Sequence, residues 1–122
     1  MENFNILLVG NKKHCSFYSD ILQNSGYEII CGNALEAVSY LKTHHFKIIV
    51  TEFNLNNHEF NGVTIFLYSK NENSDSVVFV SCPILSVDFI KEKYAFDGIL
   101  HNSMSPDEIR RFISGIVAGH NK

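Results

Sequence analysis

The sequence predicts a single α/β domain with a doubly wound parallel sheet and helices on both faces. Short, unbroken apolar runs at residues 5–9 (NILLV) and 48–50 (IIV) indicate strands covered on both faces. The segments between such runs carry apolar residues at helical spacing, so strand and helix alternate five times. Right-handed crossovers then place helices on both sides of the sheet.

The first half of the chain predicts strands over residues 5–9, 27–31 and 46–52, separated by helices over residues 14–24 and 34–43. The first helix has an apolar face made of Phe17, Tyr18, Ile21 and Leu22. It ends at Ser25 and Gly26, and the glycine suits a left-handed cap. Asn33 and Glu36 predict a capping box for the second helix, which His44 and His45 close. The buried face of that helix is Ala37, Val38 and Leu41.

The second half predicts strands over residues 77–80 and 98–100, with helices over residues 62–69, 86–94 and from residue 106 onward. Residues 62–69 (GVTIFLYS) are helical by position, although their composition would equally suit a strand. Residues 71–76 form a polar loop. Ser105, Pro106 and Glu108 give the clearest helix start, with a cap, a first-turn proline and a capping box. The apolar stripe of that helix is Ile109, Phe112, Ile113, Ile116 and Val117.

Composition narrows the class of protein. A chain of 122 residues fits one domain, spanning residues 1–122. The net charge of -3 and the scattered basic residues argue against direct binding of nucleic acid. Cys15, Cys31 and Cys82 are an odd number without close pairing, which indicates free thiols in a reducing compartment. With no apolar run near the ~20 residues that span a bilayer, we expect a cytoplasmic domain without membrane contact.

Six histidines raise the question of a metal site. None of their spacings matches a zinc template, so we expect surface histidines and no bound metal. They are His14, His44, His45, His58, His101 and His120.

The candidate site lies around Glu52. In open α/β sheets the ligand crevice lies outside the carboxyl ends of the strands, and Glu52 ends the strand of residues 46–52. Cys82 and His101 are expected at the same edge, where a thiolate–imidazole nucleophile is conceivable. Without an identifiable third group, Cys82 is better interpreted as a small core residue.

The motifs, in order, are NILLV with a following loop, SGYEI, FKIIVTE, Asn61 with Gly62, VVFVS, DGIL and a final Ser-Pro-Asp-Glu helix start. In this order and spacing the chain resembles a receiver domain of bacterial two-component response regulators over essentially its whole length. The resemblance implies a flavodoxin-like sheet of five strands in the order 2-1-3-4-5. It also implies a phosphorelay role, in which an Asp ending the third strand accepts a phosphoryl group from a kinase phosphohistidine.

The resemblance identifies the positions at which an active receiver carries its acidic residues. This sequence lacks the expected acids at those positions. Two acids that help hold Mg²⁺ correspond to Gly10 and Asn11, and the phosphoacceptor corresponds to Glu52, one methylene longer than Asp. A single carboxylate with neutral neighbours supplies an octahedral Mg²⁺ site poorly, so we expect no Mg²⁺ binding and no other cofactor.

The remaining family positions lie on the fourth and fifth strands. Ser81 keeps the expected hydroxyl and is a switch position, whereas the lysine position falls on Asn102. The aromatic switch position falls on Ile99. Phosphoryl transfer depends on positioning and charge stabilisation, so these changes predict a degenerate receiver, or pseudo-receiver, without orthodox phosphorylation.

The expected function is therefore protein–protein interaction in a signalling pathway, without enzymatic activity. The partner is a kinase or an output protein that docks on the last strand and final helix region, and homodimerisation is an alternative. Glu52 could mimic the phosphorylated state, in which case Glu52→Gln would weaken the partner interaction. Other interpretations are a solvated acid without a role, an unconventional receiver phosphorylated on Glu52 or another residue, and a thiol-dependent enzyme using Cys82 and His101.

Overall fold

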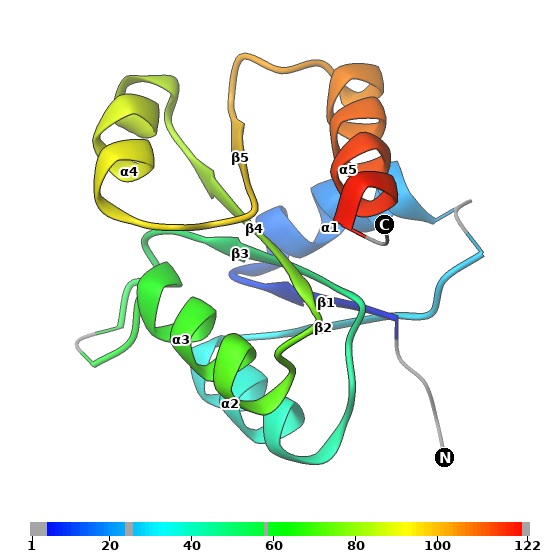
Figure 1. The fold of residues 1–122 in the computed structure, drawn as a ribbon, viewed down its shortest axis with the longest axis vertical. Helices are drawn as coiled ribbons and strands as arrows, with labels where there is room; N and C mark the ends of the chain where they lie inside the picture. The colour runs from blue at the N-terminus through cyan, green and yellow to red at the C-terminus, as the bar shows by residue number, and fades with distance from the viewer. Residues whose placement is uncertain (1–4, 24–25, 58, 121–122) are drawn as a thin grey trace.

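A five-stranded parallel sheet forms the centre of the computed structural model, which describes residues 5–23, 26–57 and 59–120 (Figure 1). The strands are β1 (Ile6–Val9), β2 (Ile29–Gly32), β3 (Ile48–Glu52), β4 (Val77–Cys82) and β5 (Gly98–His101). They lie in the order β2-β1-β3-β4-β5, and every neighbouring pair is parallel. The predicted fold class and strand order are thus confirmed.

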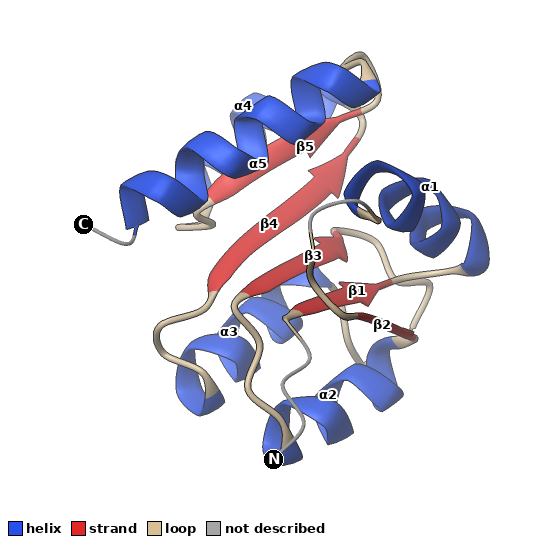
Figure 2. Cartoon of the chain, turned by 90° about the vertical axis from the view of Figure 1, so that its right-hand side faces the viewer, coloured by secondary structure: helices blue, strands red, loops and turns tan. Residues whose placement is uncertain are grey.

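Helices cover both faces of this sheet (Figure 2). They are α1 (Lys12–Leu22), α2 (Ala34–Thr43), α3 (Gly62–Glu72), α4 (Val87–Lys93) and α5 (Pro106–His120), with a 3₁₀ turn, η1 (Ile84–Ser86), before α4. Helices α1 and α5 pack on one face, and α2, α3 and α4 pack on the other. Among the described residues, no helix is long and apolar enough to cross a membrane.

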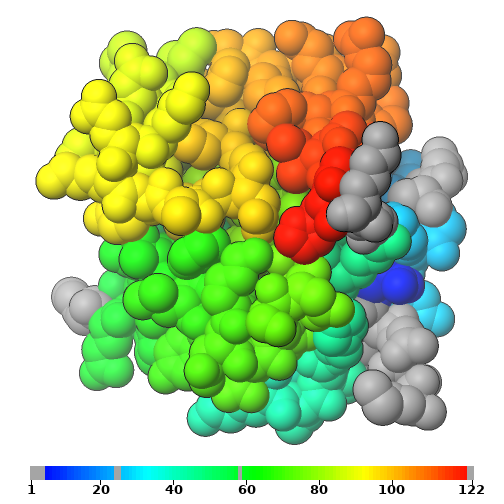
Figure 3. Space-filling model, viewed as in Figure 1, coloured from blue at the N-terminus to red at the C-terminus, as the bar shows by residue number. Residues whose placement is uncertain are grey.

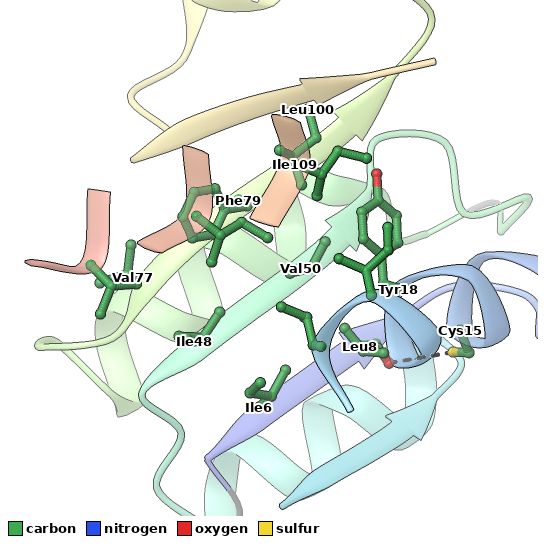
Figure 4. Packing of buried hydrophobic residues seen from close by; sticks show 14 residues of the cluster. Ile6, Leu8, Cys15, Tyr18, Ile48, Val50, Val77, Phe79, Leu100 and Ile109 are labelled. Carbon is green, nitrogen blue, oxygen red and sulfur yellow. Dashed lines mark hydrogen bonds between the residues drawn. The ribbon is translucent and has the colours of Figure 1, made fainter. Parts of the chain in front are cut away.

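The core divides along the alternating side chains of the central strands. Ile6 and Leu8 of β1 point toward α1 and α5 (Figure 4). Leu7 and Val9 point toward α2 and α3, and all four side chains are fully buried. Fully burying an aliphatic side chain contributes about 1.5–3 kcal/mol. The carboxyl ends of β1 and β3 are therefore held by a rigid, doubly covered sheet.

Local capping residues set several helix boundaries. Asn33 and Glu36 form the predicted capping box, with both hydrogen bonds at 2.9 Å. Ser105 and Glu108 form the second predicted box, at 3.2 and 2.9 Å. Gly26 has the expected positive φ of 82°, while Ser25 lies outside the described residues.

Several predicted boundaries were wrong. Strands β2 and β3 begin at Ile29 and Ile48 rather than at residues 27 and 46, and β4 continues through Cys82 rather than ending at residue 80. The first helix begins at Lys12 rather than residue 14, because the Asn11 side chain accepts the His14 amide at 2.8 Å and caps the helix. The segment 62–69 is the start of a helix, α3, capped by Asn61. That helix continues through Glu72, so the predicted loop of residues 71–76 begins later than expected.

Asn73 links three elements at the amino end of the sheet. Its side chain is 3% exposed, and its Oδ1 accepts the Phe46 amide at 2.7 Å just before β3. Its Nδ2 donates to the carbonyls of Leu41 and His44 at 3.3 and 3.4 Å, at the end of α2. The end of α3 is thereby tied to the connection between α2 and β3.

Candidate functional site

The candidate site forms where β1, β3 and β4 end side by side. Val9 pairs with Thr51, and Glu52 pairs with Ser81, so the residues that follow β1 face the ends of β3 and β4. The structure therefore brings Gly10, Glu52 and Ser81 to one edge, as predicted from the strand ends.

An imidazole fills the middle of this site. His14, in the first turn of α1, is only 6% exposed. Its Nε2 lies 3.3 Å from the Val50 carbonyl oxygen, and its Nδ1 lies 3.4 Å from the Ser81 hydroxyl oxygen. The same Nδ1 lies 3.7 Å from a Glu52 carboxylate oxygen. The expectation that the histidines lie on the surface is therefore wrong for His14.

The other histidines differ from His14. His45 and His120 are exposed, and His44 and His101 are half-buried. His58 lies outside the described residues.

Helix geometry explains how His14 reaches the site. Asn11 caps α1 through its side chain and donates its backbone N–H to the Glu52 carboxylate. His14 and Tyr18 are one turn apart, and their ring centroids lie 4.8 Å from each other. Tyr18 belongs to the apolar face that the sequence predicts, and residue 14 lies four positions earlier on that same face. Extending the stripe back to the Asn11 cap would have revealed His14.

Gly10 makes room for this arrangement. A Cβ atom at this position would lie 2.8 Å from Cδ2 of His14 and 2.9 Å from Cδ of Glu52. Both distances are shorter than van der Waals contact, so a side chain on residue 10 and the observed positions of His14 and Glu52 exclude one another. The absence of a side chain on residue 10 is thus a steric condition for the observed position of the buried imidazole.

The charge state of the site follows from its burial. Burial lowers the pKa of His14 to about 4, although the hydrogen bond with Val50 opposes this shift. Because a carbonyl only accepts hydrogen bonds, the neutral imidazole carries its proton on Nε2. Burial also raises the pKa of Glu52, against the Asn11 amide. At neutral pH the contact between His14 and Glu52 is therefore not an ion pair.

Glu52 is partly buried, with 22% of its side chain exposed, and its carboxylate contacts His14 and the Asn11 amide. Ser81 is also engaged, because its hydroxyl lies near His14 and hydrogen-bonds the Tyr18 hydroxyl. Burial raises the pKa of Tyr18 to about 12, and this hydrogen bond acts in the opposite direction. The polar side chains at this edge of the sheet therefore contact or hydrogen-bond one another.

The surroundings of these residues disfavour both enzymatic arrangements that they suggest. Ser81 and Glu52 approach the same ring nitrogen of His14, whereas a proton relay needs the nucleophile and the acid on different nitrogens. Cys82 and His101 are register partners on β4 and β5. Burial raises the pKa of the Cys82 thiol, which disfavours the reactive thiolate.

The remaining predicted positions lie toward α4. Asn102 is exposed, and its Oδ1 accepts the Ile84 amide of η1 at 3.1 Å. Ile99 is half-buried and packs in the cluster around Val80 and Ile90. The structure thus gathers Gly10, Asn11, Glu52 and Ser81, whereas Asn102 and Ile99 contribute to the neighbouring surface beneath η1 and α4.

The donor set does not fit the Mg²⁺ that the resemblance implies. Within residues 5–23, 26–57 and 59–120, no three His, Cys, Asp or Glu side chains are grouped so that they could hold a metal ion. Mg²⁺ requires hard oxygen ligands in octahedral geometry, and the site offers one carboxylate beside an imidazole.

Several solved structures with the same fold are receiver domains. A response regulator receiver protein from Sinorhizobium medicae WSM419 is 13% identical, with a TM-score of 0.81, and the match covers 98% of each chain. A CheY-like receiver domain protein from Methanospirillum hungatei JF-1 is also 13% identical, with a TM-score of 0.76 and 98% of each chain covered.

The receiver domain of a sensor histidine kinase from Pseudomonas aeruginosa PAO1, solved with magnesium coordinated in its active-site cleft, is 14% identical. Its TM-score is 0.78, and the match covers 96% of this chain and 99% of that one. No family model and no curated protein matches the chain. The chain therefore has the fold of CheY-like receiver domains.

Proposed function

We propose that the chain is a degenerate receiver of two-component signalling in the cytoplasm, which acts by binding a protein partner and does not undergo orthodox phosphorylation. The observation that carries this proposal is the His14 imidazole, buried between Val50, Glu52 and Ser81. It occupies the edge of the sheet where a receiver would bind its metal and phosphoryl group. A side chain of the domain itself thus occupies the space that a metal ion and a phosphoryl group would take in a receiver.

Electrostatics supports the absence of phosphoryl chemistry. Transfer of a phosphoryl group requires cations that neutralise the developing charge. Here the imidazole is neutral because burial lowers the pKa of His14 to about 4, and Asn102 stands at the lysine position. Burial already raises the pKa of Glu52, so further negative charge beside it would be unfavourable. No Mg²⁺ or other cofactor is part of the proposed function.

The proposed partner surface consists of Ile84, Leu85 and Phe89, on η1 and α4. These residues are 47%, 94% and 51% exposed. The segment that carries them, coloured yellow-green to yellow, forms an outer corner of the molecule (Figure 3). Phe112 and Ile116 of α5, by contrast, are half-buried against the core. Grouped exposed apolar side chains are typical of protein-binding sites. The proposed surface therefore lies on η1 and α4, next to the predicted last strand, and does not include the final helix.

The partner surface is connected to the candidate site. Asn102, at the end of β5, holds the Ile84 amide, and Pro83 links η1 to the end of β4. A protein bound through Leu85 would thus contact a segment whose position depends on the ends of β4 and β5. Under this proposal the partner binds the domain in a single conformation, and phosphorylation of the sheet edge is not required for binding.

An NMR titration tests the proposed loss of phosphoryl chemistry. Amide resonances are followed during addition of Mg²⁺ and then beryllofluoride, an aspartyl-phosphate mimic, with an active receiver domain as the positive control. We expect no saturable shift at Gly10, Asn11, Glu52 or Ser81 with millimolar Mg²⁺. Saturable shifts at these four positions would overturn the proposal in favour of an unconventional receiver that accepts a phosphoryl group on Glu52 or another residue.

The partner surface is tested separately with matched leucines. Leu85 on η1 and Leu35 on α2 are both exposed, at 94% and 61%, so neither substitution removes core packing. Proteins retained from the source cell by the wild type should be retained by Leu35→Ser and lost with Leu85→Ser. Retention of the same partner by both variants would show that η1 is not the docking surface, and a second copy of the chain as the partner would identify a homodimer.

A further inference from the structure

Cys15 and Cys31 lie on the same face of the sheet, although 16 positions separate them in the sequence. Cys31 of β2 pairs in register with Leu8 of β1, and register partners in a parallel pair point to the same side. Leu8 faces α1, and the Cys15 thiol of α1 lies 3.7 Å from the Leu8 carbonyl oxygen (Figure 4). The two thiols are thus neighbours over the gap between β1 and β2.

The surroundings of Cys15 place it against this strand pair. Its sulfur also lies 3.9 Å from the Gly10 carbonyl oxygen and near the Gly32 amide, the residue after Cys31. Burial and hydrogen bonding with the Cys31 thiol raise the pKa of Cys15 to about 12. Cys31 therefore lies near enough to Cys15 to influence its ionisation, on the same side of the β1–β2 pair.

The two thiols differ in access. Cys31 is exposed on the edge strand β2, whereas Cys15 is buried beneath α1. Cys82, the third cysteine, lies on β4, two strands away from β1 in the sheet. A reagent in solution should therefore meet Cys31 first, and Cys15 is the thiol placed to react next.

We propose that Cys15 and Cys31 form a redox-active dithiol that closes to an intramolecular disulfide by exchange with a low-molecular-weight disulfide such as oxidised glutathione. The Cys31 thiolate attacks the small disulfide, forms a mixed disulfide and releases one thiolate. Cys15 then gives up its proton and attacks the Cys31 sulfur, which releases the second thiolate. Overall, two protein thiols are oxidised to one disulfide and the small disulfide is reduced to two thiols.

Closure would fasten the first turn of α1 to the edge strand β2. Cys15 directly follows His14, whose imidazole fills the candidate site, and it contacts the carbonyl of Gly10. The disulfide would therefore add a covalent restraint beside the buried imidazole. This proposal does not depend on the proposed signalling function, because it concerns the chemistry of two side chains.

Mass spectrometry of the full chain tests the proposal. The reduced protein is equilibrated with mixtures of reduced and oxidised glutathione, alkylated under denaturing conditions and measured intact. Cys82→Ser is the matched control that keeps the dithiol, and we expect it to lose two hydrogen atoms and to take up no alkylating reagent. Cys31→Ser should show no loss of two hydrogen atoms, and peptide mapping of the wild type should show one cross-link, between Cys15 and Cys31.

Closure should also become faster as the pH rises from 7 to 9, because the buried Cys15 must lose its proton before it attacks. A persistent glutathione adduct on Cys31, a disulfide that includes Cys82, or a disulfide between two chains would overturn the proposal. Peptide mapping of the wild type decides between these results even where a cysteine variant does not fold.

Discussion

At the scale of single residues, His14 connects the stability of the fold to pH. Its imidazole is buried and neutral, and burial lowers its pKa to about 4 from an ordinary value of 6.5. The unfolded chain therefore binds a proton more readily than the folded one in this range. The stabilising contribution is complete above pH 6.5 and is lost as the pH falls toward 4. Glu52 acts in the opposite direction, since burial raises its pKa and protonation favours the folded state.

We predict that His14→Gln makes stability less sensitive to acid. The glutamine amide can still donate to the Val50 carbonyl, but it does not titrate. A shift from 6.5 to about 4 corresponds to about 3 kcal/mol, so the wild type should lose up to that much more unfolding free energy than the variant. Urea denaturation at pH 7, 6, 5 and 4 measures the difference, and parallel pH profiles of the two proteins would contradict it.

The residue scale also shows what a sequence can reveal of the site. Glu52 was predicted because it ends a strand, and Ser81 because it keeps the hydroxyl that the resemblance to receivers implies. His14 was missed because a histidine near a helix start is usually exposed. Its burial depends on the space left by Gly10 and on the carbonyl of Val50, 36 residues later in the chain.

At the scale of elements, side chains that cap one helix can also fix the next connection. Asn33 and Ser105 cap the helices that directly follow them, so the neighbouring residues in the sequence were enough to predict both caps. Asn73 is different, because it follows α3 yet bonds to the end of α2 and to the start of β3. The sequence assigned it to a polar loop, since its partners come from elsewhere in the chain.

Asn73→Ala should destabilise the protein strongly. The substitution leaves the buried Phe46 amide without its acceptor and removes the donor to Leu41 and His44, which we expect to cost about 2–4 kcal/mol. Asn71→Ala is the matched control, because Asn71 is exposed and should change stability by less than about 0.5 kcal/mol. Denaturation midpoints in urea distinguish the two, and equal midpoints would show that the Asn73 bonds contribute little.

At the scale of the whole molecule, burial is distributed unevenly across the sheet. The residues of β1 are all buried, and so are all but the last residue of β3, whereas β2 at one edge is mostly half-buried or exposed. Alternating strands and helices predicted a doubly wound sheet, whereas the strand order came from the resemblance to receiver domains. The sequence did not reveal which strand is least protected, because β2 and β1 have similarly apolar sequences.

Amide hydrogen exchange should be slow in the buried strands β1 and β3 and faster in the edge strand β2. We expect the amides of β1 and β3 to exchange at the rate of global unfolding, and those of β2 to exchange at least about tenfold faster through local opening. Exchange measured by mass spectrometry on the native protein provides the test. Equal protection of β2 and β3 would mean that the edge strand opens only when the whole domain unfolds.

The absence of a side chain at Gly10 has a consequence for how this sequence can vary. Any other residue there would place a Cβ atom against the His14 ring and the Glu52 carboxyl. A substitution at position 10 would therefore be accommodated only together with a shift or a change of His14, Glu52 or both. The three positions thus form one mutational unit, in which residue 10 does not vary independently of its two neighbours.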